Sequence, residues 1–258
     1  MKKNKTALVT GSTSGIGLGI AIELASAGYN LIFNGLEENG EEIAKSIADK
    51  YKIEAIFSSA NLLYSVEIEK MIHFSEEKFG CIDVLVNNAG IQYVSPIEDF
   101  PEEKWNAIIN INLTSAFHTT RLVWKKMKSQ KFGRIINIAS AHGLVASEYK
   151  SAYVAAKHGL IGFTKTIALE GAPFNINANS ICPGYVKTPL VDKQIKDQAK
   201  AHGISEYEVI NKIMLYKQSV KDFIPVETIG KLTVFLSSDE AKTITGSSFP
   251  IDGGWSAQ

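Results

Sequence analysis

Residues 6–17 read TALVTGSTSGIG, and this stretch decides the fold. Thr6 to Thr10 has the pattern of a short buried strand, a glycine-rich turn follows, and an apolar helical pattern runs from Ile16 to Ala27. Glycines let backbone N–H groups approach a ligand closely, and the helix N-terminus behind them favours a diphosphate. The spacing G-x-x-x-G-x-G after a first strand therefore predicts dinucleotide binding, although any tight turn between a strand and a helix needs glycine. The predicted contacts are Gly11, Thr13, Ser14, Gly15, Ile16 and Gly17.

The rest of the chain repeats the alternation of strand and helix. Further strands are predicted at 30–34, 54–58, 82–86, 134–138, 176–181 and 248–251, and helices at 41–50, 65–79, 105–128, 151–170 and 228–237. Strands separated by helices of this length imply right-handed crossovers and a parallel sheet. The sequence predicts one α/β domain over residues 1–258, a doubly wound Rossmann-type fold with a central parallel sheet. Residues 188–223 are charged and amphipathic, and are interpreted as a helical lid over a substrate, with a surface helical pair as the alternative.

Composition narrows the function. The 258 residues are 45% hydrophobic, which is enough for one large core. The 27 basic residues balance the 27 acidic ones, so we expect no nucleic-acid partner and no attraction to an anionic membrane. Cys81 and Cys182 predict no disulfide framework, and the five scattered histidines predict no metal site. The first apolar stretch breaks at Gly11, too soon for a signal peptide, so the expected location is the cytoplasm.

A tyrosine and a lysine stand four positions apart in the segment Ser151-Ala152-Tyr153-Val154-Ala155-Ala156-Lys157. On a helix, that spacing puts both side chains on one face. The ammonium of Lys157 would favour the phenolate, so we expect a lowered pKa for Tyr153, which could then exchange a proton during carbonyl–alcohol chemistry. The pattern also arises by chance, with a surface tyrosine covering the lysine stem.

The residues after the second strand predict the choice of cofactor. The chain reads Asn34-Gly35-Leu36-Glu37-Glu38, with no Arg or Lys nearby. A 2′-phosphate would meet an apolar side chain and two carboxylates, which is repulsive. The sequence therefore predicts NAD rather than NADP, although no carboxylate stands directly at the strand end.

Taken in order, several motifs resemble one family. They are the Gly11/Gly15/Gly17 turn, Asn87-Asn88-Ala89-Gly90, Ser140, Tyr153-x-x-x-Lys157 and Pro183-Gly184. Over essentially its whole length the chain is similar to the short-chain dehydrogenase/reductase family. The resemblance implies an oxidoreductase that moves a hydride to or from a nicotinamide. Gly35 and Asn61 depart from the family pattern, because acidic residues commonly stand there.

The same resemblance implies roles for the catalytic residues. Tyr153 would be the general base in oxidation and the acid in reduction, while Lys157 would lower its pKa and hold the nicotinamide ribose. Ser140 would hydrogen-bond the substrate oxygen, and Asn112 would hold a water beside Lys157 in a proton relay. From its own sequence context, Asn112 could also be a helix-interior asparagine that kinks the helix. Further implied cofactor contacts are Leu36, Asn61, Leu62, Asn88, Ala89, Gly90, Pro183, Gly184, Val186 and Thr188, beside Tyr153 and Lys157.

A closer likeness concerns the segments 90–92, 117–121, 141–147, 150–153 and 252–258. They are similar to bacterial members of the family that interconvert D-3-hydroxybutyrate and acetoacetate with NAD. This likeness implies that the substrate carboxylate is held near Ser140 and Tyr153 by Gln92, His142, Lys150 and Gln194, all of which can donate hydrogen bonds. Without the likeness, Lys150 and Gln194 read as solvated residues. The apolar walls of the pocket would be Tyr185, Leu190 and Trp255.

Other functions stay open at this point. A 3-oxoacyl carrier-protein reductase or a sugar alcohol reductase would share the motifs, and a non-catalytic dinucleotide sensor would share the fold. Sensors of this kind commonly lose the tyrosine or the lysine, whereas this chain keeps Ser140, Tyr153 and Lys157. Family members also pair the long helices predicted at 105–128 and 151–170 across a two-fold axis. The resemblance therefore implies a homo-oligomer, a tetramer.

Overall fold

The computed structural model describes residues 4–257, except for the side chains of Leu190, Lys193, Asp197, Gln198, Ala201 and His202. Seven parallel strands form its sheet, in the order β3-β2-β1-β4-β5-β6-β7. Their bounds are β1 Thr6–Val9, β2 Asn30–Asn34, β3 Ala55–Ser58, β4 Val84–Asn87, β5 Gly133–Ile138, β6 Ile176–Pro183 and β7 Ser248–Ile251. This is the predicted doubly wound α/β fold, and the strand order reverses at β1, between β2 and β4.

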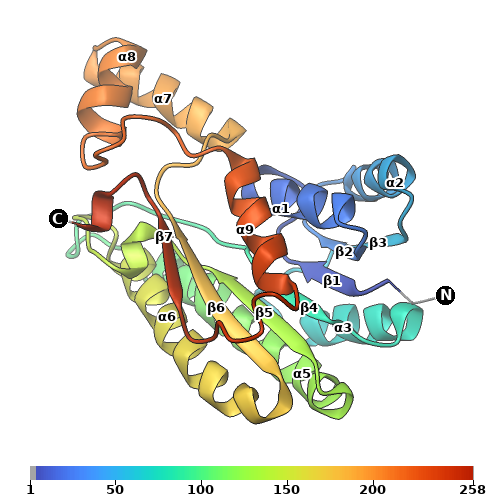
Figure 1. The fold of residues 1–258 in the computed structure, drawn as a ribbon. Helices are drawn as coiled ribbons and strands as arrows, with labels where there is room; N and C mark the ends of the chain where they lie inside the picture. Colours follow the sequence, from blue (N-terminus) through green and yellow to red (C-terminus); the bar gives the residue numbers. More distant parts are fainter. Residues whose placement is uncertain (1–3, 258) are drawn as a thin grey trace.

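Helices cover both faces of the sheet (Figure 1). One face carries α1 (Gly15–Ser26), α2 (Gly40–Tyr51) and α9 (Val226–Ser237), and the other carries α3 (Ser65–Phe79), α5 (Ser115–Gln130) and α6 (Ser151–Gly171). Neighbouring strand residues alternate between two hydrophobic cores, because successive side chains of a strand point to opposite faces. Val9 and Phe33 belong to the core under α1, α2 and α9, while Leu8 and Ile32 belong to the core under α3 and α5.

The long helix predicted at 105–128 is interrupted. It consists of α4 (Glu102–Ile109), a π-helical turn at Asn110–Thr114, and α5. A π turn widens the helix by one residue and often marks a functional position. Here it contains Asn112, the residue for which the sequence left a kink as one interpretation. Short 3-10 turns lie at Ala141–Gly143, Ala172–Phe174 and Trp255–Ala257.

Residues 188–223, the lid segment, form a lobe of their own beyond the sheet (Figure 1). The lobe contains α7 (Pro189–His202), α8 (Glu206–Glu208) and a π-helical turn at Val209–Met214. Its side chains make a separate small core of Val191, Ile195, Val209 and Met214.

The two connections of the lid segment to the domain lie side by side. Lys187 N–H donates to the carbonyl of Ile224 at 3.0 Å, and Ile224 N–H donates to the carbonyl of Tyr185 at 2.9 Å. Val186 and Ile224 form a parallel bridge, and both side chains are buried in the core under α1 and α9. These connections form an anchored neck, and the segment has a second backbone attachment, because Ser219 and Val220 N–H also donate to the Gly253 carbonyl, at 2.7 and 2.9 Å.

Candidate active site

A cavity of about 920 Å³ lies where the carboxyl ends of β1 and β4 part. In open parallel sheets, the point where strand order reverses leaves a crevice for a ligand. Most of the predicted site residues line this cavity: Gly11, Thr13, Ser14, Gly15, Ile16, Gly17, Leu36, Asn61, Leu62, Asn88, Ala89, Gly90, Gln92, Ser140, Tyr153, Lys157, Pro183, Gly184, Thr188 and Gln194. Of the predicted catalytic, cofactor-binding and carboxylate-binding residues, four do not line it, namely Asn112, His142, Lys150 and Val186.

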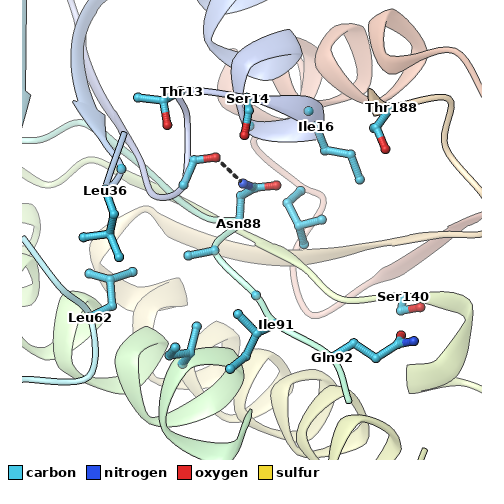
Figure 2. Close-up of a pocket in the computed structure, with 18 of the residues that line it drawn as sticks. Thr13, Ser14, Ile16, Leu36, Leu62, Asn88, Ile91, Gln92, Ser140 and Thr188 are labelled. Carbon is cyan, nitrogen blue, oxygen red and sulfur yellow. Dashed lines mark hydrogen bonds between the residues drawn. The ribbon is translucent and has the colours of Figure 1, made fainter. Parts of the chain in front are cut away.

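The glycine-rich turn forms one wall of the cavity. Gly11 and Gly15 have φ angles of +60° and +53°, a region in which other residues are strained. A Cβ at Gly17 would stand 2.1 Å from the Gly11 carbonyl oxygen, so the helix can start this close to the turn only with glycine there. The Asn88 amide donates to the carbonyls of Thr10 and Gly11 at 2.9 and 3.0 Å, which fixes the turn from β4 (Figure 2). A narrow cradle at a helix N-terminus fits the diphosphate of a dinucleotide.

Leu36 and Leu62 lie together at one end of the cavity, far from Ser140 and Gln92 at the other (Figure 2). Between Leu36 and the turn stands a carboxylate that the sequence did not place. Glu37 accepts hydrogen bonds from the hydroxyls of Thr13 and Ser14, the latter at 3.3 Å, and from the Leu36 N–H at 3.0 Å. The bond from Thr13 contributes most to holding the pKa of Glu37 below its ordinary value.

Gly35 makes room for Glu37 to fold back. A Cβ at Gly35 would stand 2.2 Å from the Thr13 hydroxyl and 2.6 Å from Glu37 Oε2. Gly35 was identified as a departure from the family pattern. In the structure, its missing side chain leaves the space in which the carboxylate of Glu37 lies. The available signal was spacing, because Glu37 follows Gly17 by about 20 positions, as acidic ribose-binding residues do.

The opposite end of the cavity holds Ser140, Tyr153 and Lys157. Ser140 follows β5, whereas Tyr153 and Lys157 stand one turn apart on α6. Lys157 is 3% exposed, and its Nζ donates to the Ile138 carbonyl at 2.8 Å and lies 5.6 Å from the centre of the Tyr153 ring. The structure thus brings together one side chain from the turn after β5 and two from α6, which the sequence linked only through their motifs.

The electrostatics differ from the expectation that the pKa of Tyr153 is lowered. Burial raises the pKa of Tyr153, and the hydrogen bond with Ser140 offsets this only in part. Burial also lowers the pKa of Lys157 to about 8. The physical reason is that the Lys157 ammonium is directed at a backbone carbonyl, while both groups are cut off from water.

Asn112 lies behind this site. Its amide donates to the Ile91 carbonyl at 2.9 Å, and its carbonyl accepts from the Ile91 N–H at 2.8 Å. A Cβ at Gly90 would be 3.2 Å from Asn112 Oδ1 and 3.6 Å from Lys157 Nζ, so the asparagine and the lysine are neighbours across Gly90. The π-helical turn therefore puts Asn112 close to Lys157, on the other side of Gly90.

His142 does not line the cavity but contacts two residues that do, Ser140 and Tyr153. Its Nδ1 lies 3.4 Å from Ser140 Oγ and its Nε2 3.0 Å from Ser147 Oγ, so both ring nitrogens have partners. The ring also meets Tyr153 and Trp255 edge-on, with centres 5.9 and 4.9 Å away. Burial lowers the pKa of His142 to about 4, with Lys150 as the next cause, so the ring is neutral at physiological pH.

Lys150 lines a second cavity of about 580 Å³ rather than the first. Ser147, Tyr185, Lys217 and Trp255 share this second cavity with Lys150. Tyr185 and Trp255, predicted as walls of the substrate pocket, stack in this second cavity with ring centres 6.0 Å apart, whereas the side chain of Leu190 lies outside the described part. His142 contacts Tyr153 of the first cavity and Trp255 of the second, so it lies between residues of the two. The four expected carboxylate ligands are therefore divided, with Gln92 and Gln194 on one side of His142 and Lys150 on the other.

Val186 stays away from the cofactor cavity, because its bridge to Ile224 turns it into the core. Among the side chains that the structure describes, which do not include those of Asp197 and His202, no group of three or more His, Cys, Asp or Glu could hold a metal ion. Over the same residues, no helix is both long and apolar enough to cross a bilayer.

The family model described as "short chain dehydrogenase" matches residues 5–199. The protein is a short-chain dehydrogenase. A D-beta-hydroxybutyrate dehydrogenase from Rhizobium meliloti (strain 1021) is 52% identical over 256 residues, covering 98% of this chain and 99% of that protein. Another from Cupriavidus necator is also 52% identical and covers 100% of both chains.

A solved actinorhodin polyketide ketoreductase variant with NADPH superposes on this short-chain dehydrogenase with a TM-score of 0.92, at 31% identity, and covers 99% of this chain and 98% of its own. Membership of the family makes the protein an oxidoreductase with a nicotinamide dinucleotide cofactor. The glycine-rich cradle, the long cavity and the Ser140–Tyr153–Lys157 cluster suit that cofactor.

Proposed function

We propose that this short-chain dehydrogenase oxidises D-3-hydroxybutyrate to acetoacetate with NAD, in a reversible reaction. The observation that carries the proposal is the placement of Ser140, Tyr153 and Lys157 at one end of a dinucleotide cavity, next to Gln92 and Gln194. Two relatives that are 52% identical over their whole length and carry the name of this activity support the choice of substrate.

Each catalytic side chain has a task that its geometry supports. When bound, the nicotinamide accepts the hydride from the carbon that bears the hydroxyl. Tyr153 takes the hydroxyl proton, and Ser140 donates a hydrogen bond to the same oxygen and keeps the carbon in place. Because burial raises the pKa of Tyr153, its phenolate needs a cation during turnover, and Lys157 is the cation one turn away. Asn112, beside Lys157, would connect this pair to a water.

The substrate carboxylate needs donors, because an unpaired charge in a closed site is costly. Gln92 lies at the Ser140 end of the cavity (Figure 2), and Gln194 reaches the same cavity from α7 of the lid segment. Lys150 supplies the positive charge from the far side of His142. We propose that Gln92 and Gln194 donate hydrogen bonds to the substrate carboxylate and that Lys150 attracts it by charge. His142 would act on the substrate through its contact with Ser140. The lid segment would close over this end and exclude water.

Lys150→Ala is expected to raise the KM for the hydroxy acid about tenfold, because the positive charge that attracts the substrate carboxylate from beyond His142 is lost. The KM for NAD should stay within about twofold, since Lys150 does not line the dinucleotide cavity. Steady-state kinetics with each substrate varied in turn measure both constants, and Lys125→Ala, at an exposed lysine of α5, is the matched control. A change confined to NAD would remove Lys150 from the substrate site.

We propose NAD as the cofactor because the Glu37 carboxylate stands between the glycine-rich turn and Leu36, on the wall that an adenosine ribose would face. A carboxylate accepts hydrogen bonds from a ribose diol and repels a 2′-phosphate. Glu37→Gln is expected to lower the ratio of kcat/KM for NAD over NADP by at least about tenfold, as one charge repulsion is removed. Glu38→Gln, at an exposed carboxylate next in sequence, should leave the ratio unchanged. Comparable kcat/KM for the two cofactors in the wild-type protein would contradict the proposal.

We also propose that the protein acts as a homo-oligomer, a tetramer. Phe117 on α5 is 45% exposed and Leu169 on α6 is 78% exposed, so both long helices offer apolar side chains to a second copy.

The deciding experiment is NADH formation from D-3-hydroxybutyrate, with the L-enantiomer and NADP as controls. We expect turnover only with the D-enantiomer and NAD. A 3-oxoacyl carrier-protein reductase is the second candidate, and a large thioester reduced faster than acetoacetate would establish it. The missing basic residues after β2 make that outcome less expected, because such reductases favour NADPH.

A further inference from the structure

Ser147 and Lys217 take no part in the proposed reaction, yet they are connected to its centre by hydrogen bonds. Lys217 lies in the lid segment, and its Nζ donates to Ser147 Oγ at 3.4 Å. Ser147 lies in the loop before α6, and its Oγ is 3.0 Å from His142 Nε2. His142 Nδ1 is 3.4 Å from Ser140 Oγ, and Ser140 is hydrogen-bonded to Tyr153. A chain of polar contacts thus runs from the lid segment to the catalytic tyrosine.

The first donor of this chain allows a direction in which each later group donates towards Tyr153. A lysine ammonium can only donate hydrogen bonds, so Ser147 Oγ is the acceptor from Lys217. The hydroxyl hydrogen of Ser147 is then available for His142 Nε2. A neutral imidazole carries one hydrogen, so an accepting Nε2 leaves that hydrogen on Nδ1, facing Ser140.

The neutral state of His142 has support from its surroundings. Burial holds the pKa of this ring at about 4, and the charges of Lys150, Lys217 and His158 act in the same direction. The ring is also fixed in place, because Trp255 and Tyr153 pack edge-on against it. Lys217 Nζ in turn lies 5.6 Å from the centre of the Trp255 ring, which keeps it near Ser147.

The direction of these hydrogen bonds decides where the hydroxyl hydrogen of Ser140 points. It has one hydroxyl hydrogen, and its oxygen already accepts from the backbone N–H of His142 at 3.1 Å. If His142 Nδ1 also donates to this oxygen, the Ser140 hydrogen is free to point at Tyr153 and the reacting oxygen. If Nδ1 were instead an acceptor, Ser140 would spend its only hydrogen on His142 and have none for the substrate.

We propose that Ser147 and the lid residue Lys217 are positioning residues, which hold His142 in the tautomer with its hydrogen on Nδ1 and thereby make Ser140 a donor to the substrate oxygen. The proposal rests on the hydride-transfer function proposed above for its consequence in catalysis. The tautomer itself is a property of the protein without substrate. The proposal about the tautomer and the proposed function can therefore be tested separately.

The direct test is ¹⁵N NMR of the full-length protein labelled at its histidine ring nitrogens, at neutral pH and without substrate. The His142 signals are assigned by their absence from His142→Asn. We expect Nδ1 of His142 to be protonated in the wild-type protein and Nε2 to gain hydrogen in Ser147→Ala. A wild-type His142 with its hydrogen on Nε2, or a tautomer unchanged in Ser147→Ala, would overturn the proposal whatever the substrate is.

Kinetics supply the second readout. Ser147→Ala and Lys217→Met are each expected to lower kcat about tenfold, the size of one misdirected hydrogen bond, with the KM for NAD within about twofold. Ser147→Thr and Lys217→Arg keep the hydroxyl and the cationic donor, and should restore most of kcat. A merely structural role for these side chains predicts no such rescue and an unchanged tautomer, so equal losses in the conservative and the disruptive variants would also overturn the proposal.

Discussion

Tyr153→Phe is expected to lower kcat by roughly 10²- to 10⁴-fold, the contribution of a positioned general acid–base group. The variant keeps the ring that packs against His142, and loses only the hydroxyl that exchanges a proton with the substrate. The side chain of residue 153 lines the cofactor cavity, and the variant retains its ring. The Kd for the dinucleotide should therefore change by less than about threefold. Steady-state turnover and a fluorescence titration with NADH measure the two effects separately.

Tyr207→Phe is the matched control for this variant. Tyr207 is 74% exposed on α8, so removing its hydroxyl should leave both turnover and cofactor affinity unchanged. Tyr153→Phe with more than about a tenth of wild-type kcat would show that another group carries the proton. A loss of dinucleotide binding in step with kcat would instead give the hydroxyl a binding role.

Lys157→Met is expected to reduce activity and to increase stability together. The folded pKa of Lys157 is about 8, below the ordinary 10.5, because burial penalises the ammonium. The folded state therefore binds fewer protons than the unfolded state between these two pH values, and stability rises with pH across that window. Below pH 8 the full penalty applies, up to about 3 kcal/mol from the size of the pKa shift.

Methionine keeps the length of the stem and removes the charge, at the expense of the hydrogen bond to Ile138, worth about 1 kcal/mol. We thus expect the free energy of unfolding of Lys157→Met to exceed that of the wild type by about 1–2 kcal/mol at pH 7. The difference should shrink as pH rises from 8 towards 10.5.

Urea unfolding of the variant and the wild type at pH 7 and at about pH 10, at one protein concentration, measures this stability difference. At the same time kcat should fall at least about 100-fold, because Tyr153 loses the cation that supports its phenolate. Lys45→Met, at an exposed lysine of α2, should change neither quantity. A destabilised Lys157→Met variant would show that the charge is better compensated than its burial indicates.

The architecture was predictable because it depends on periodicity. The alternation of buried strands with amphipathic helices fixed the order of the elements, and the cores confirm the two-sided burial of residues such as Leu8 and Val9. The turn from Gly11 to Gly17 was also predictable, because close backbone approach demands glycine. The placement of Ser140, Tyr153 and Lys157 on one wall followed from family order along the chain.

The sequence did not show which groups the individual side chains of the site contact. Nothing in it showed that Lys157 is directed at the Ile138 carbonyl, which leaves the pKa of Tyr153 raised by burial rather than lowered. The return of Glu37 to Thr13 depends on the space left by Gly35, which only three-dimensional contacts reveal. The separation of Lys150 from Gln92 depends on a ring, His142, that spacing alone cannot orient.

The anchored neck of the lid segment limits how the active site can open. Besides the neck at Tyr185–Lys187 and Ile224, Ser219 and Val220 N–H both donate to the Gly253 carbonyl, so the segment is held at two places. A swing of the whole segment about the neck would therefore also have to break the hydrogen bonds to Gly253. Because Gln194 and Lys217 both belong to the segment, such a swing would withdraw a substrate ligand and the first donor of the hydrogen-bond chain together.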